Sequence, residues 1–368
     1  EFSVTAVAAI PRWTRRRLLA ATSLAAGAAG RFGAAVAADP SADAAGGPLR
    51  RIAVGSCADP GRSAPIWGAV AQSRPDLMVY AGDNVYASEQ PWSLTRLQAA
   101  YAQLAADSGF AQLRAGARSF AIWDDHDYGL NDGGAEFVHK QASKDAFLAF
   151  WGAAADDPRR TREGNYHSAV WGPPGRRVQL IGLDNRWFLS RWRVTDQRDA
   201  PGKERYLPDP DPAKTMLGAA QWAWLEDQLR EPADLRLIVS GLQIVAVGHG
   251  FERWGNFPHE RQRLFDLIAR TRAQGVLLLS GDRHFGALYR ETEGVAYPLV
   301  EMTSSGITHP WTTVQEPDAK RVGEIVRVKH FGTVDIDWAQ RQVVLTLRDE
   351  RGQVSSELRV ALADLQSR

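Results

Sequence analysis

The sequence predicts a layered α/β fold in which two packed sheets form one domain. Three observations predict it. Short β-rich runs alternate with helical patterns from residue 51 onward, most of these runs are nearly unbroken apolar stretches of strand length, and strands replace helices beyond residue 295. Such alternation is typical of layered α/β proteins, and continuously apolar strands are expected where both faces of a sheet are covered. At about 150 residues per domain, 368 residues allow two domains, but a large layered fold takes up this length as one.

The elements are expected in a simple order. The first six strands cover residues 52–56, 77–81, 120–123, 178–183, 237–242 and 276–280. Helical patterns between them lie at 93–114, 143–154, 219–229 and 259–273. Four further strands follow at 298–303, 332–337, 343–348 and 356–361. The segment 196–215 is rich in Pro, Asp and Arg, and is predicted to be a long surface loop.

Composition excludes several classes of protein. The chain has 44 Lys and Arg against 43 Asp and Glu, with 44% hydrophobic and 24% charged residues, which rules out collagen-like, low-complexity and disulfide-stapled proteins. Its single cysteine, Cys57, cannot form an internal disulfide and is a free thiol, a metal ligand or a core residue. The sequence has no Gly-x-Ser-x-Gly elbow, no Gly-x-x-x-x-Gly-Lys phosphate loop and no Cys-x-x-Cys pair, so it indicates none of the chemistries that they serve.

The first 38 residues are similar to an export signal. Arginines at 15–17 precede a weakly apolar stretch at 18–30, and a small-residue run at 34–38 ends in an A-x-A-like cleavage site. The apolar stretch is too short and too rich in Ala and Gly to span a bilayer. Paired arginines followed by two Leu resemble a twin-arginine signal, which exports folded proteins; a Sec signal with an arginine-rich start is the alternative. We therefore expect twin-arginine export of a mature domain at 39–368 to the bacterial periplasm or the medium.

The mature chain is expected to be soluble and slightly acidic. Residues 1–38 hold five Arg and one Glu, so their removal changes the formal charge from +1 to −3. This balance gives no basic footprint for nucleic acid. No other apolar run reaches the roughly 18 residues of a membrane span. Glu1 and Phe2 stand where an initiator Met is expected, which indicates a cloning remnant or an incomplete start, and we set them aside.

Side chains that can bind metals follow several of the predicted strands. They are Gly55-Ser56-Cys57 after the first strand, Gly82-Asp83-Asn84-Val85-Tyr86 after the second, Trp123-Asp124-Asp125-His126-Asp127 after the third and Ser280-Gly281-Asp282-Arg283-His284 after a later one. Ligand sites in open α/β sheets lie at the carboxyl ends of strands, so we hypothesise that these four tips converge. Each motif alone also fits a structural role, as a buried thiol, a turn-capping Asp or a structural His. Together, three or more carboxylates at strand tips would repel one another unless cations neutralised them, so the sequence predicts a metal site.

These blocks resemble a known superfamily, the calcineurin-like metallophosphoesterases. The resemblance is carried by Gly82-Asp83-x-x-Tyr86, by the Asp-Asp-His-Asp run at 124–127 and by Gly281-Asp282-x-His284. Most of that superfamily has Asp-x-His, Gly-Asp, Gly-Asn-His-Asp/Glu and Gly-His-x-His blocks, from which this sequence departs at Cys57, Asp125 and Asp282. The departures match the alkaline phosphatase D (PhoD-type) branch, as do Trp254-x-x-Phe257-Pro258-x-x-Arg261 and His330-Phe331-Gly332. The similarity covers about residues 51–340.

The resemblance implies a fold and a metal centre. The fold is a four-layer αββα sandwich of two mixed sheets flanked by helices, and the centre pairs iron (Fe³⁺) with calcium or another divalent cation. The implied metal ligands are Cys57, Asp83, Tyr86, Asp125, Asp282 and His284. Thiolate, phenolate and imidazole are placed around the iron, the carboxylates of Asp125 and Asp282 suit the harder second cation, and Asp83 fits the bridge. The division of Asp282 and His284 between the two metals is left open.

The implied activity is hydrolysis of phosphate monoesters or diesters by attack of a metal-activated hydroxide on phosphorus. His126 corresponds to the histidine that supports the transition state or protonates the leaving alkoxide, and Asp127 is the candidate that orients it. Arg186 and Arg283 are the best cations to grip non-bridging phosphate oxygens, with surface salt bridges as an equal alternative.

The competing function is a non-catalytic periplasmic protein on the same fold that binds a glycan or a lipid. Trp187, Trp192, Trp254 and Trp311 lie in loops near the strand tips, where they would stack on such a ligand, although core packing is the favoured interpretation of these residues. The intact His126 argues against a purely binding protein. Asn131 and Asp132 are interpreted as the turn after the third strand.

Overall fold

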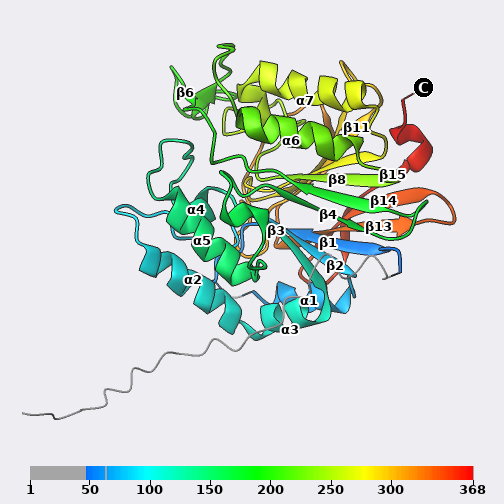
Figure 1. Cartoon of the computed structure of the whole chain (residues 1–368), viewed down its shortest axis with the longest axis horizontal. Coiled ribbons are helices and arrows are strands. Elements are labelled where there is room, and N and C mark those ends of the chain that lie inside the picture. Colours follow the sequence, from blue (N-terminus) through cyan, green and yellow to red (C-terminus); the bar gives the residue numbers. More distant parts are fainter. Residues whose placement is uncertain (1–46, 63, 368) are drawn as a thin grey trace, which may run out of the picture. The chain divides into compact units, whose positions relative to one another are not determined.

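Two mixed β-sheets form the centre of the fold in this computed structural model, which describes residues 47–62 and 64–367 (Figure 1). The predicted export signal at 1–38 lies outside the described residues. The six-stranded sheet has the spatial order β15 (Val354–Ala361), β14 (Gln342–Asp349), β13 (His330–Asp337), β1 (Arg51–Gly55), β2 (Leu77–Ala81) and β3 (Arg118–Ile122). The seven-stranded sheet has the order β12 (Arg321–Val326), β10 (Gly286–Glu291), β11 (Leu299–Ser304), β9 (Val276–Ser280), β8 (Leu235–Ser240), β5 (Val178–Gly182) and β4 (His167–Trp171). β6 (Arg193–Val194) and β7 (Tyr206–Leu207) form a separate ribbon.

Helices cover the outer face of each sheet. Those packed on the six-stranded sheet are α1 (Ile66–Gln72), α2 (Leu94–Ala106), α3 (Ser108–Gly116) and α5 (Lys140–Trp151), and those on the seven-stranded sheet are α6 (Gly218–Arg230) and α7 (Pro258–Thr271). The remaining short elements are α4 (Asp125–Tyr128) and 3₁₀ turns at Pro158–Arg160, Trp254–Asn256 and Leu362–Leu365. The arrangement confirms the predicted fold class, two mixed sheets with flanking helices.

Strand β2 shows how the sequence builds these layers. Successive strand side chains point to opposite faces of a sheet. Leu77 and Val79 join the core that lies between the sheets and continues under α6 and α7, while Met78 and Tyr80 join the core under α1, α2, α3 and α5. All five residues of β2 are buried, which is why the segment contains no polar alternation.

The strand pairing brings the segments that follow several strands together at one edge of the sheets. β1 pairs with β2 and β2 with β3 in parallel, so the chain leaves all three strands in the same direction. β8 and β9 are likewise parallel in the other sheet. A bridge between Ser56 and Ser305 joins the residues that follow β1 and β11, so the two sheets meet at this edge.

Several local predictions need correction. The helix expected at 93–114 is two helices, because Asp107 between them is extended, with φ −67° and ψ 119°, and its side chain accepts the backbone N–H of Phe110 at the start of α3. The loop expected at 196–215 contains β7. Helix α1 and strands β4, β10 and β12 had no sequence prediction. Within the described part of the chain, no helix combines the length and the apolar character needed to cross a membrane.

Candidate metal centre

The strand tips place two groups of possible metal ligands side by side. Cys57, Asp83 and Asp125 follow β1, β2 and β3 of one sheet, and Asp282 and His284 follow β9 of the other. Their ligand atoms gather within 4.8 Å of one another in overlapping groups. The structure therefore brings together side chains that are separated by more than 200 residues in the sequence.

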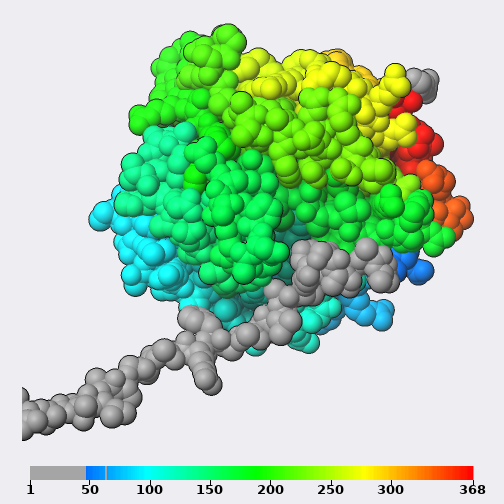
Figure 2. Space-filling view, viewed as in Figure 1, coloured from blue at the N-terminus to red at the C-terminus, as the bar shows by residue number. Residues whose placement is uncertain are grey.

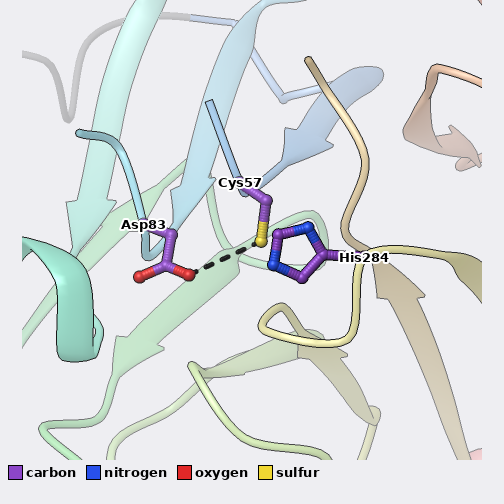
Figure 3. A group of neighbouring side chains, drawn as sticks. All are labelled: Cys57, Asp83 and His284. Carbon is purple, nitrogen blue, oxygen red and sulfur yellow. Dashed lines mark hydrogen bonds between the residues drawn. The ribbon is translucent and has the colours of Figure 1, made fainter. Parts of the chain in front are cut away.

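The first group consists of Cys57, Asp83 and His284 (Figure 3). The Cys57 Sγ lies 3.6 Å from Oδ2 of Asp83, and the Tyr86 hydroxyl lies 3.5 Å from the same oxygen. Nδ1 of His284 donates to the carbonyl oxygen of His309 at 3.0 Å, which leaves Nε2 as the ligand nitrogen. A thiol, a carboxylate and an imidazole thus lie together, with the phenol of Tyr86 beside the carboxylate.

The second group consists of carboxylates alone, from Asp83, Asp124, Asp125 and Asp282. Asp83, Asp124 and Asp125 are buried, and Asp282 is partly exposed. Oδ2 of Asp124 and Oδ1 of Asp125 are buried and have no hydrogen-bond partner among the described residues. Buried carboxylate oxygens without partners are costly, so this donor set fits a cation that prefers oxygen ligands.

The electrostatics of the carboxylates agree with this fit. Burial, reinforced by the charge of Asp125, raises the pKa of Asp83 well above its ordinary value. Burial also raises the pKa of Asp124 and that of Asp282 to about 7 each. Each shift reflects negative charge held out of water without enough compensation, and a bound cation would supply that compensation.

The pKa values of Asp125 and Cys57 shift in opposite directions. Burial acts to raise the pKa of Asp125, but His126 and Arg186 outweigh it and hold the pKa at about 2. Burial raises the pKa of the Cys57 thiol to about 11. A metal that binds this sulfur must displace its proton.

The backbone holds the ligand positions in an unusual conformation. Cys57, Asp83, Asp282 and His284 have positive φ angles of 59°, 50°, 66° and 55°. Left-handed conformations are uncommon for residues other than glycine and gather at functional sites. The turn at each tip is therefore fixed by the surrounding fold.

Two glycines make room for Asp124. A Cβ on Gly241 would lie 2.5 Å from Cγ of Asp124, and a Cβ on Gly82, where φ is +94°, would lie 2.6 Å from its Cβ. Neither position accepts a side chain without displacing this carboxylate.

His126 is half-buried and forms a further group of possible ligands with Asp83 and Asp125. Its Nδ1 is 2.7 Å from Oγ of Ser88, its backbone N–H donates to Oδ1 of Asp83 at 3.2 Å, and its ring centroid is 4.1 Å from that of Tyr86. Nδ1 is thus occupied, and Nε2 is the nitrogen available for proton transfer.

Asp127, expected to orient this imidazole, has other partners. Its carboxylate accepts the backbone N–H groups of Asn84 and Val85 at 3.1 and 3.2 Å, the N–H of Asp124 at 3.2 Å and the hydroxyl of Tyr101 at 3.3 Å. It fixes the turn after β2 and the start of α4. The structure assigns the contact with the imidazole to Ser88 instead.

The two arginines expected to grip phosphate are both internal. Arg186 is fully buried; its Nε donates to Oδ1 of Asp124 at 2.5 Å and its Nη1 to Oε1 of Glu252 at 2.7 Å. Arg283 is buried in an ion pair with Glu316. Burial with carboxylate partners disagrees with a role in meeting substrate, because a phosphate-gripping guanidinium needs an accessible face.

The four tryptophans divide into two kinds. Trp187, Trp192 and Trp254 are buried, which confirms the core interpretation for these three. Trp311 is 39% exposed, and its ring lies edge-on to Phe251.

Sequence reasoning missed four contributors. Ser88 orients His126, and the carbonyl of His309 orients His284. Asp132, interpreted as a turn residue, donates its backbone N–H to Oδ2 of Asp125 at 2.8 Å. Asp132 and the buried Glu252 form a further carboxylate group with Asp125, and no sequence signal marks Glu252. His309 contributes its backbone carbonyl, which no residue type marks in a sequence.

Comparisons with known proteins identify relatives of this chain. The model of the family described as PhoD-like phosphatase matches residues 52–359. Among solved structures, the "Structure of PhoD" is similar with a TM-score of 0.67 and 16% identity, over 85% of this chain and 68% of that one. GAP50, "the anchor in the inner membrane complex of Plasmodium", has a TM-score of 0.55 and 13% identity over 87% and 90%. The purple acid phosphatase PPD1 from yellow lupin (Lupinus luteus) has a TM-score of 0.57 and 11% identity over 86% and 54%. The search of curated proteins found no match.

Proposed function

Since this chain belongs to the PhoD-like phosphatase family and is a hydrolase of phosphate esters, we propose that it hydrolyses monoesters and diesters at a two-cation centre on its strand tips. One observation carries the proposal. Asp83 belongs both to the group with Cys57 and His284 and to the group with Asp125 and Asp282. A carboxylate shared by two ligand sets fits the bridge of a two-metal phosphoesterase site.

The donor chemistry supports unlike cations. Cys57, Tyr86 and His284 would hold iron, because sulfur, phenolate and imidazole suit a transition metal. Asp125 and Asp282 would hold calcium or another divalent cation that prefers oxygen. When bound, the two cations would supply the Lewis acidity and the acidified water that attack on phosphorus requires.

His126 would act on the leaving group. With Nδ1 held by Ser88, Nε2 delivers a proton to the departing alkoxide oxygen. Tyr86, His126, Asp282 and His284 are the partly exposed members of the centre, so substrate would approach from their side.

The test combines metal analysis with turnover. The purified mature protein should contain two kinds of metal and should hydrolyse p-nitrophenyl phosphate and bis(p-nitrophenyl) phosphate. His126→Ala should keep its metals while kcat falls by about 10² or more. If this variant loses metal, His126 is a ligand; if the metal-loaded wild type hydrolyses neither ester, the proposal fails.

Colour tests the iron assignment separately. A phenolate bound to ferric iron should give the protein a ligand-to-metal charge-transfer band. Tyr86→Phe should bleach much of this band, because it removes the phenolate and keeps the ring. An active, colourless enzyme without iron would favour two oxygen-bound divalent metals instead.

We also propose that the chain is exported folded, through the twin-arginine route. Replacing Arg15 and Arg16 together by Lys should stop export, whereas a Sec passenger needs only positive charge there. Normal secretion of the double variant would favour Sec.

A further inference from the structure

The segment between β6 and β7 brings a cation to the edge of the metal centre. Arg205 directly precedes β7, and its Nη1 lies 3.0 Å from Oδ2 of Asp132. The Tyr206 hydroxyl donates to the same oxygen at 2.6 Å. Asp132 in turn forms a carboxylate group with Asp125 and Glu252. One carboxylate therefore separates the guanidinium of Arg205 from a proposed ligand of the second cation.

The backbone around Arg205 is firmly held. Its N–H and that of Tyr206 both donate to the carbonyl of Gly250, at 3.0 and 2.6 Å, and its own carbonyl accepts the N–H of Thr195 at 2.8 Å. The guanidinium carbon lies 5.5 Å from the centroid of the Phe251 ring. In Figure 2 this bright-green segment forms a prominence at one corner of the view. These backbone hydrogen bonds fix the position from which the Arg205 side chain extends.

Accessibility distinguishes Arg205 from the other two arginines. Its side chain is 40% exposed, against 0% for Arg186 and 6% for Arg283. Among the described residues, its guanidinium makes one side-chain hydrogen bond, through Nη1, so the donors on Nε and Nη2 remain available. Burial acts to lower the pKa of Arg205, but Asp132 and, more weakly, Asp282 outweigh burial, so the pKa is raised overall and the group is a permanent cation.

We propose that Arg205 binds the non-bridging oxygens of the substrate phosphate and makes the enzyme prefer doubly charged monoesters to singly charged diesters. This inference rests on the proposed function. A phosphate monoester has its second pKa near 6, so at pH 8.5 it carries about two negative charges where a diester carries one. A guanidinium fork suits such oxygens, and its attraction scales with the charge that it meets.

The experiment compares Arg205→Ala and Arg205→Lys with wild type, and Arg198→Ala serves as the matched control. Arg198 lies on the same loop with a 72% exposed side chain. For Arg205→Ala, kcat/KM should fall about 10- to 100-fold with p-nitrophenyl phosphate, the usual effect of losing a charged hydrogen bond. With the diester, kcat/KM should fall about 3- to 10-fold, because the diester carries about half the negative charge of the monoester. Arg205→Lys should lie between Ala and wild type.

Binding of inorganic phosphate, measured by calorimetry on the metal-loaded protein, is the readout that does not depend on turnover. Arg205→Ala should weaken it about 10-fold or more, with metal content and Tm unchanged. The inference would be overturned if Arg205→Ala left both the phosphate Kd and the ratio of monoester to diester kcat/KM unchanged. It would also be overturned if Arg205→Ala lost metal, or if Arg198→Ala weakened phosphate binding equally. If wild type hydrolyses neither ester, the proposed function fails, while the calorimetry still decides whether Arg205 binds phosphate.

Discussion

Replacing Arg186 by Met should destabilise the fold by about 3–5 kcal/mol and leave substrate affinity nearly unchanged. The guanidinium is fully buried between Asp124 and Glu252, whose side chains are 0% and 3% exposed. Met fills a similar volume but leaves two buried carboxylates without their partner. Removing one side of a buried ion pair typically costs the amount given, because the remaining charge cannot return to water.

Thermal unfolding of the metal-loaded protein measures this cost. One kcal/mol shifts Tm by about 2–4 °C in domains of roughly 150–250 residues. This chain is longer, so we use the smaller shift of about 2 °C for each kcal/mol, and Tm should fall by about 6–10 °C. Arg198→Met, on the exposed loop, is the control and should stay within about 0.5 kcal/mol of wild type. If Arg186→Met melts like wild type but raises KM tenfold at constant kcat, the guanidinium meets substrate and the buried-pair reasoning is wrong.

Three further results are expected. Asp83→Asn should abolish turnover and, in a metal titration, weaken metal binding by more than about 100-fold, which exceeds the usual effect of losing a residue that only hydrogen-bonds a ligand. Normal metal retention would contradict the bridging role. Ser88→Ala should lower kcat about 10-fold at constant metal content, because His126 loses its orienting bond; an unchanged pH–rate profile and kcat would speak against this contact. In metal-stripped protein, stability to urea should fall as pH rises from about 4 to about 7, because the folded state keeps protons on Asp124 and Asp282 that the unfolded chain releases near pH 4; added metal should remove this slope, and a flat profile without metal would refute it.

The sequence located some elements because their burial leaves a clear pattern. The strands predicted at 77–81 and 276–280 coincide with β2 and β9, which are apolar throughout except for the terminal Ser280. The predicted helix at 93–114 failed because Asp107 is compatible with a helical pattern, and its extended backbone depends on capping α3. Strands such as β12, with two exposed residues in six, have no unbroken apolar run to reveal them.

The site was predictable where topology alone places a residue. Cys57, Asp83 and Asp125 follow parallel strands, so their meeting required only the strand-tip rule. Glu252 and Ser88 lie in segments that no such rule positions. The burial of Arg186 between two carboxylates was not predicted either, because a sequence shows that an arginine is present but not which carboxylates surround it.

The origin of the candidate ligands in both sheets has a consequence for how long the folded state lasts. Asp83 and Asp125 belong to the six-stranded sheet, whereas Asp282 and His284 belong to the seven-stranded one. Cations bound between them would tie the two halves of the sandwich across their common edge. Pulling the sheets apart would then require ligand bonds to break before the apolar core opens, which raises the barrier to unfolding as well as the equilibrium stability. Metal occupancy would thus set the lifetime of the protein against heat and proteases, even in conditions where no substrate is present.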